Sequence, residues 1–305
     1  MNAIERLYKT TLQPWNEQRR FRNKDTSLSE YCISSLKLDE LHQPDAPQLL
    51  EKIAKLCEQS FSAGVGQIQQ TASTLKFDCM SDQSLPHPIK WNQQHGFEES
   101  SDVQWGLTHG AVGLDTILAN RQGESWLIDF AQVGSAPLLI DFVALETAVK
   151  FQHLSTKNLT IRCHLEEALN KMKRLNAATQ SAALTPEGNT TLKTIQKIRT
   201  LASEITGANL ATYQQALFYY SLAHLQQYDP TKQVQRRTLT SFIHALLSAA
   251  LIAQKIQATE NGDAPPDAKA GGLWIDSQEK EVWVEGRQIT TLTPQDYQIL
   301  DMVQK

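Results

Sequence analysis

The sequence has no excess of basic residues and no segment typical of export or membrane insertion. Its 305 residues carry 29 lysines and arginines against 33 aspartates and glutamates, a net charge of −4. That balance supplies no global basic field to attract nucleic acid or an anionic membrane. The N-terminus lacks the apolar core of a signal peptide, and the longest apolar stretch, 242–256, is shorter than a bilayer span. We therefore predict a cytoplasmic protein that does not contact a membrane.

Cysteine is also scarce. The four cysteines, Cys32, Cys57, Cys79 and Cys163, lie far apart and lack the spacing of metal ligands. We interpret them as buried or incidental thiols of a protein in a reducing compartment. With 41% hydrophobic and 20% charged residues, the composition is that of a soluble globular protein. The length suits one large domain or two smaller ones.

A glycine-rich loop of the kind that cradles phosphates is missing. Such a loop needs a strand before it, whereas Gly64-Val65-Gly66 follows a helical pattern and is interpreted as a helix terminator. A Val-Ala-Ile-Lys-like strand is likewise absent from the residues that precede the centre of the chain. We therefore expect no nucleotide-binding N-lobe.

Apolar residues at helical spacing dominate the pattern. Ser27 is the expected N-cap of a short second helix, and Phe61 is placed on the buried stripe of the third. His224 and His244 lie on or beside such stripes and are interpreted as core or rim histidines. Residues 70–105 are expected to be irregular, and 177–189 to form a loop. The other helices are predicted at 3–18, 47–61, 138–151, 159–176, 190–206, 210–228 and 231–257.

Two short apolar runs near the centre, 116–119 and 125–128, flank a polar turn at 120–124. This pattern predicts a β-hairpin in which Gly123 is free to adopt a positive φ. A polar loop, 109–115, leads into the hairpin, and Asp129 follows it. Together they form a frame that can hold a metal-phosphate group near Asp129.

The chain changes character after the last predicted helix. Residues 258–270 are polar and rich in proline, glycine and alanine, as expected of a flexible linker. Three short strands follow at 273–276, 281–285 and 287–290, with a turn at Gly286. A helix is predicted to open with Thr293 as N-cap and Pro294 at its first position.

The central frame resembles the catalytic segment of the aminoglycoside phosphotransferase and choline kinase-like fold. That family carries His-Gly-Asp-Leu-His-x-x-Asn-Ile-Leu and then a strand that ends in Ile-Asp-Phe. The matching residues are His109, Gly110, Ile117, Leu118, Ile128, Asp129 and Phe130. The departures fall at the chemical positions: the family's catalytic aspartate falls on Ala111, its metal-binding asparagine on Thr116, and its second histidine on Gly113.

These departures predict a degenerate site. Ala111 cannot accept a proton from a substrate, and Thr116 offers one hydroxyl where an amide oxygen would bind Mg²⁺. Asp129 remains as the candidate metal ligand. Asp115 could replace the missing ligand only if it faced the same way as Thr116, but neighbouring side chains on a strand face opposite ways. Asp141 lies where the family has an acid that pins the loop through backbone amides, which implies a structural role.

A narrower resemblance comes from the order of several motifs. Leu-Tyr-x-x-x-Leu-x-Pro-Trp at 7–15, Thr-His-Gly at 108–110, Trp-Leu-Ile-Asp-Phe at 126–130 and Asp-Phe-Val-x-Leu-Glu at 141–146 occur in one order. Residues 1–257 therefore resemble the phosphotransferase-like "ternary complex associated" domain of bacterial signalling and conflict proteins, often fused to STAND-type NTPases or DNA-binding domains. The resemblance implies a mainly α fold with a small β-hairpin. It corresponds to the helical C-lobe of the protein-kinase-like fold without its N-lobe, and it implies an adaptor that binds protein partners.

Residues 271–305 resemble the start of an OmpR-type winged-helix DNA-binding domain. That family has a small sheet before Leu-Thr-Pro-x-Glu-Tyr-x-Leu-Leu, and Asp296 takes the place of the glutamate. The resemblance stops at Lys305, whereas the family's recognition helix and wing come later. We therefore expect DNA contact only where the module is completed beyond Lys305.

Three functions remain open at this point. The first is a catalytically inactive adaptor that has protein partners, requires no cofactor and is not an enzyme. The second is a transcription regulator of the winged-helix class, favoured by the residues after 270. The third is an active phosphotransferase that uses Mg-ATP with Asp129 and Asp115. We prefer the first, because Ala111, Thr116 and the missing N-lobe all argue against catalysis.

Overall fold

The computed structural model describes residues 3–18, 21–22, 25–43, 46–80, 83–97, 103–122, 124–207, 209–232, 234–260, 273–276, 281–284 and 287–289. The chain divides into two compact units, Met1–Ala253 and Gln254–Lys305, and each is described by itself. Helices make up 58% and strands 11%, with small antiparallel sheets. The prediction of a mainly α fold is therefore confirmed.

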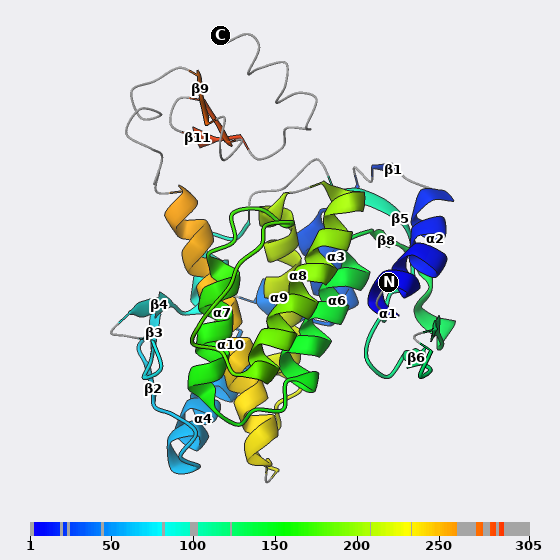
Figure 1. The fold of residues 1–305 in the computed structure, drawn as a ribbon. Helices are drawn as coiled ribbons and strands as arrows, with labels where there is room; N and C mark the ends of the chain where they lie inside the picture. Colours follow the sequence, from blue (N-terminus) through cyan, green and yellow to red (C-terminus); the bar gives the residue numbers. More distant parts are fainter. Residues whose placement is uncertain are drawn as a thin grey trace. The chain divides into compact units, whose positions relative to one another are not determined.

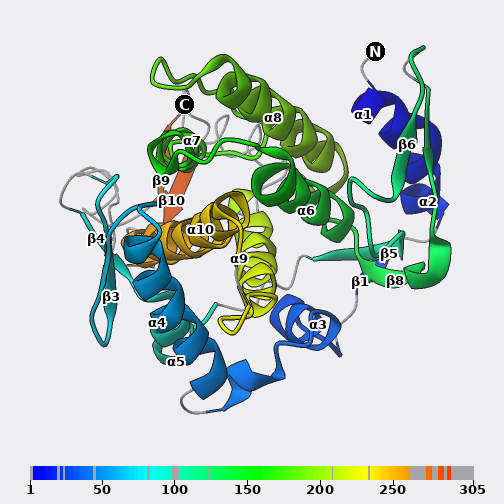
Figure 2. The same cartoon turned by 90° about the horizontal axis from the view of Figure 1, so that it is seen from below.

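Two long helices form the centre of the first unit. Figure 2 shows α9 (Leu210–Gln226) and α10 (Arg236–Glu260) with other helices around them. The surrounding helices are α3 (Leu28–Ser35), α4 (Pro47–Ser62), α6 (Ile140–Thr147), α7 (Leu159–Asn170) and α8 (Pro186–Thr206). A π-helical segment, Ala148–His153, continues α6. The helices predicted within residues 3–257 all occur, with boundaries that shift by several residues.

Helix α10 contains the one candidate membrane span found among the described residues. Its segment Arg236–Ala258 is long and apolar enough to cross a membrane, with a mean hydropathy of 1.4, but 83% of its most apolar window is buried inside the protein. This degree of burial is that of a core helix. Because α10 begins at Arg236 and ends at Glu260, the prediction of a helix over 231–257 began too early. The expected linker therefore loses its first three residues to the helix.

The N-terminal helices follow the predicted pattern closely. The helical run 3–18 is built from α1 (Ala3–Leu7), a π-helical segment (Tyr8–Leu12) and α2 (Gln13–Gln18). Ser27 caps α3 in a capping box: its hydroxyl accepts from the Glu30 amide at 3.2 Å, and the Glu30 carboxylate accepts from the Ser27 amide at 2.9 Å. The prediction that Ser27 caps this helix is confirmed.

The prediction for Phe61, on α4, is wrong. The apolar pattern of the sequence places its side chain on the buried stripe, but the side chain is 68% exposed. Ser60 takes the inward position of the last turn instead, and its hydroxyl donates to the Gly66 carbonyl at 2.6 Å. A side chain one residue further along a helix points about 100° away, so Phe61 faces outward.

The prediction that residues 70–105 are irregular is wrong. An antiparallel sheet contains β2 (Ile68–Gln70), β3 (Thr74–Phe77) and β4 (Ser84–Pro86), and the short helix α5 (Pro88–Gln94) follows. The strands are only three or four residues long, so too few alternating positions exist to reveal a strand. A second sheet has the order β1 (Phe21–Arg22), β5 (Gln104–Thr108) and β8 (Gly134–Pro137).

The interpretation of all four cysteines as thiols is wrong for two of them. Cys79, in the turn after β3, forms a disulfide with Cys163 on α7, with Cα atoms 6.3 Å apart. The bond fastens the β2–β4 sheet to the helical body. The two residues are 84 positions apart, so the pair could not be predicted from local spacing. Cys32 and Cys57 are buried thiols, as expected, and burial raises the pKa of Cys57 to about 12.

Reducing this disulfide is expected to lower the free energy of unfolding by about 2–4 kcal/mol, because an open loop of this length regains conformational entropy in the unfolded chain. Urea unfolding with and without dithiothreitol measures the change. The Cys79→Ser/Cys163→Ser variant is the control: it should begin at the lower stability and ignore the reductant. A parent protein whose unfolding midpoint ignores the reductant would contradict the prediction.

The second unit contains one small sheet among its described residues. Strands β9 (Leu273–Asp276), β10 (Glu281–Val284) and β11 (Arg287–Gln288) are antiparallel in sequential order, with Trp283 paired to Trp274 and to Gln288. The three predicted strands are confirmed, with slightly shorter bounds. The predicted turn at Gly286, the linker residues 261–270 and the helix opening at Thr293 and Pro294 lie outside the described residues.

Candidate functional site

The candidate site is built between two paired strands of the first unit. Strand β5 pairs with β8 so that Thr108 lies opposite Gly134, and the chain between these two residues forms the loop and the hairpin. Gly110, in this loop, has a φ of +80°, and a Cβ there would lie 2.4 Å from the carbonyl oxygen of Gln132. Only glycine fits this position without displacing the backbone, so Gly110 is required by the shape of the loop.

Asp141, in the first turn of α6, anchors the loop. Its carboxylate accepts hydrogen bonds from the backbone amides of His109, at 2.8 Å, and Gly110, at 2.9 Å. This is the contact that the resemblance implies for Asp141. Burial raises the pKa of the Asp141 carboxyl, and the two backbone hydrogen bonds oppose that rise. The side chain is 3% exposed and is therefore a structural support rather than a group open to a ligand.

His109 ties the loop to the hairpin. Its imidazole is fully buried, and Nε2 lies 3.0 Å from the carbonyl oxygen of Ile128, so Nε2 carries the proton and donates. The ring also packs edge-on against Phe130 with centroids 5.5 Å apart. This histidine therefore holds the chain just before Asp129 in place.

Of the three positions that depart from the phosphotransferase pattern, Ala111 and Thr116 are those where a catalytic or metal-binding group would lie, and neither carries a free ligand group. The Thr116 hydroxyl accepts from the Gly113 amide at 2.8 Å and lies 3.1 and 3.2 Å from the carbonyl oxygens of Ala111 and Gly113. Thr116 is only 5% exposed, and its hydroxyl closes a local turn. Ala111 contributes a carbonyl to that turn and a methyl side chain.

Asp129 is the carboxylate that remains at the site. It is exposed, and its backbone lies in the left-handed region with φ 61° and ψ 73°. Aspartate is one of the few residues other than glycine that visit this region. Asp115 is exposed as well. Within the described residues, no three histidine, cysteine, aspartate or glutamate side chains gather where they could hold a metal ion.

The hairpin itself forms as predicted. Strands β6 (Ile117–Ala119) and β7 (Ser125–Leu127) pair antiparallel, with Leu118 opposite Trp126, while Gly123 lies outside the described residues. Ser125 and Leu127 are buried, whereas Trp126 between them is 50% exposed. The sequence predicted the hairpin but gave no signal for which of its faces would stay outside, because both strands contain apolar residues on each face.

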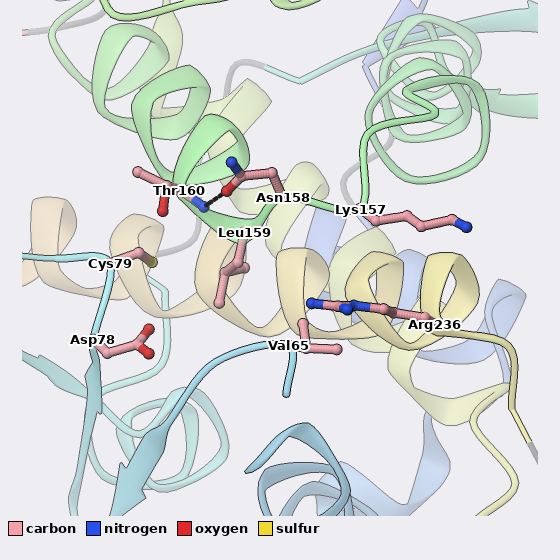
Figure 3. A pocket seen from close by; sticks show the side chains of 8 residues that line it. All are labelled: Val65, Asp78, Cys79, Lys157, Asn158, Leu159, Thr160 and Arg236. Atoms are coloured by element: carbon pink, nitrogen blue, oxygen red, sulfur yellow. Dashed lines mark hydrogen bonds between the residues drawn. The ribbon is translucent and has the colours of Figure 1, made fainter. Parts of the chain in front are cut away.

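A separate pocket of about 600 Å³ lies beside the disulfide, between β3 and the start of α7 (Figure 3). Three of its polar side chains hold segments of the protein together: Asp78 accepts from the Gln67 amide at 2.8 Å, Asn158 caps α7, and Arg236 donates to the Gly64 carbonyl at 2.6 Å. In Figures 1 and 2 the β2–β4 sheet and the hairpin lie at opposite sides of the helices of the first unit. The pocket is therefore not part of the candidate site.

No known protein family, curated protein or solved structure matches this chain. The function is thus argued from the residues and their geometry. Those residues describe a loop held by buried contacts, an exposed carboxylate at Asp129 and a hairpin with exposed apolar side chains. The site has the loop and the hairpin, but it has few of the groups that phosphoryl transfer needs.

Proposed function

We propose that residues 1–257 form a catalytically inactive, phosphotransferase-like adaptor domain that binds protein partners in the cytoplasm. On this proposal, the helices correspond to the C-lobe of the protein-kinase-like fold, and the protein acts in bacterial signalling. The domain needs no cofactor for this role. The Cys79–Cys163 disulfide is the observation that opposes a reducing compartment, because disulfides are rare there and mostly regulatory.

One observation carries the proposal: most polar groups at the site are used in contacts that hold the loop itself in place. The Thr116 hydroxyl is used inside the loop, and Ala111 stands where an acid would accept the proton of an attacking hydroxyl. Asp141 and His109 are buried in contacts that fix the loop. A single carboxylate at Asp129 would leave Mg²⁺ without the second protein ligand that the catalytic-loop asparagine supplies in kinase-like sites.

Mg-ATP is expected to leave the thermal unfolding midpoint unchanged in both the parent protein and the Asp129→Ala variant. Binding stabilises a fold in proportion to the logarithm of ligand concentration, so a ligand at about 100 times its Kd would add roughly 2.7 kcal/mol. Thermal shift and calorimetry with Mg²⁺ and ATP measure this, alongside an assay for ATP turnover. A shift or turnover that disappears in Asp129→Ala would show a working nucleotide site and overturn the proposal.

A second candidate function rests on the small sheet of the second unit. The antiparallel order of β9, β10 and β11 is compatible with the start of a winged-helix domain, and supports a transcription regulator in which residues 1–257 act as the sensor. The described strands of this unit contain one basic residue, Arg287. Since phosphate contacts from lysine and arginine dominate DNA affinity, we expect no sequence-specific DNA binding by these residues alone.

A further inference from the structure

Five large apolar side chains are exposed on and beside the hairpin, and we name them the hairpin face. They are Leu114 (39% exposed), Leu118 (51%), Trp126 (50%), Ile128 (37%) and Phe130 (51%). Among the described residues, only one other large hydrophobic residue, Phe61, is exposed. Single exposed apolar residues are normal on a protein surface, but a contiguous group marks an interaction site.

The backbone geometry places three of these side chains on one face of the hairpin. Leu118 and Trp126 are directly opposite each other in the antiparallel pair, so their side chains leave the same face of the sheet. Ile128 lies two residues after Trp126 and therefore points to the same side. On the opposite face of β7, Ser125 and Leu127 are buried.

The hairpin face is held rigidly. Helix α1 packs against β7, Phe130 contacts the Trp15 ring with centroids 5.8 Å apart, and the buried imidazole of His109 contacts Phe130 and Ile128. Side chains that packing within the protein already holds, such as that of Phe130, lose little freedom on binding. The surface is thus prepared for a partner by contacts within the protein.

The shape of the hairpin favours an extended peptide. Strands β6 and β7 form a two-stranded sheet in the described chain, so β6 has β7 on one side and no described strand on the other. Leu118 and Ala119 on β6 are exposed. A peptide can add as a third strand, with backbone hydrogen bonds at the edge and alternate side chains against the hairpin face.

The charges around the hairpin face indicate which peptide fits. Within the segment 114–130, which carries these side chains, Asp115, Glu124 and Asp129 are exposed, against one guanidinium, Arg121. Pairing with a second copy of the chain would bring two surfaces of the same negative sign together, which is unfavourable. A segment with lysine or arginine between its apolar residues would meet charges of opposite sign.

We propose that the hairpin face is the docking surface for an extended peptide segment in which apolar side chains alternate with lysine or arginine. The proposal rests on the adaptor function and specifies its partner. Apolar residues of the peptide cover Trp126 and Leu118, while its basic residues lie near Asp115 and Asp129. Binding is therefore expected to weaken as salt rises.

The test is selection of a random 12-residue peptide display library against the full chain, followed by fluorescence anisotropy with the enriched peptides. We expect enrichment of apolar and basic residues together. Leu118→Ser/Trp126→Ser should weaken binding at least tenfold. The matched control is Phe61→Ser, which removes an exposed apolar side chain away from the hairpin and should change the Kd by less than twofold. Asp115→Asn/Asp129→Asn should weaken binding and reduce its salt dependence.

Several results would overturn the proposal. Failure to enrich any peptide, enrichment of acidic peptides, or a Kd that Leu118→Ser/Trp126→Ser leaves within twofold would each do so. So would a dimer, detected by sedimentation, that this variant dissociates, because a second copy would then cover the hairpin face. Thermal unfolding confirms that each variant is folded, and Trp126→Ser alone replaces the double variant if that one is not. Nucleotide turnover would refute the inactive adaptor, whereas these results bear on the docking surface alone.

Discussion

Replacing Glu146 by alanine is expected to lower the free energy of unfolding by about 3–5 kcal/mol. Glu146 on α6 is fully buried and accepts two hydrogen bonds from the Arg199 guanidinium on α8, at 2.7 and 2.8 Å. It also accepts from the Tyr213 hydroxyl at 2.9 Å. The substitution would leave a buried guanidinium, 2% exposed, without its counter-charge. A buried unpaired charge is among the most destabilising features that a single substitution can create.

Urea unfolding at pH 7 measures this effect. The matched control is Glu51→Ala, which breaks the exposed ion pair between Glu51 and Lys55 and should change the free energy of unfolding far less, because water and salt screen the pair. The double variant Glu146→Leu/Arg199→Met should recover much of the lost stability, because it removes both charges and retains apolar volume. A loss at Glu146 no larger than that at Glu51 would show that the buried pair contributes little.

Lowering the pH from 7 to 4 is expected to destabilise the protein strongly. Burial lowers the pKa of His87, His224 and His244 to about 4 each, with nearby positive groups adding to this effect. At His244, the Glu166 carboxylate opposes the shift, but the Arg162 guanidinium lies 2.9 Å from Nδ1. That nitrogen must therefore accept, which keeps the imidazole neutral while Nε2 donates to Glu166 at 2.7 Å.

The sign follows from proton uptake. An unfolded chain protonates these histidines near their ordinary pKa of 6.5, whereas the folded chain does so only near 4. Between these values the unfolded state binds more protons, so the free energy of unfolding falls as the pH falls. The stability is fully present above about pH 6.5, and each histidine contributes a loss on the order of 2–3 kcal/mol by pH 4.

Glu166 adds a loss of the same sign at lower pH. Burial alone would raise the pKa of its carboxyl, but the Lys150 ammonium, 2.6 Å away, and His244 outweigh burial and hold it at about 2. Protonation in the unfolded chain near pH 4.5 therefore destabilises the fold as the pH falls toward 2. Urea unfolding at half-unit pH steps measures both windows. His224→Gln should reduce the slope between pH 6.5 and 4, and an unchanged slope would contradict the account.

The buried polar pairs show where sequence reasoning stops. His244 and His224 were predicted as core or rim histidines from the apolar stripes around them, and both lie in the helical interior. The partners could not be predicted: Lys150 and Glu166 are on different helices, and Arg199 lies 53 residues from Glu146. An isolated charged residue on a helix has the same local pattern whether it faces water or a partner across the core.

The candidate site also combines features that the sequence predicts with features that it could not predict. The motif alone predicts the loop, the hairpin and the departures at Ala111 and Thr116, because they depend on residue types at fixed spacing. The hairpin face could not be predicted. Trp126 and Leu127 are adjacent and both apolar, so the sequence does not show which of the two side chains is buried. Only the packing of α1 decides which of them is covered.

By itself the sequence determined the helices, the capped start of α3, the central hairpin and the three C-terminal strands, because each depends on local periodicity, turns and caps. The tertiary structure alone decided the disulfide between Cys79 and Cys163, the ion pairs inside the helical core, and the outward position of Phe61 and Trp126. These features depend on which segments meet across long sequence separations. Contact between distant segments is settled by the packing of whole faces and not by any single residue's neighbours in the chain.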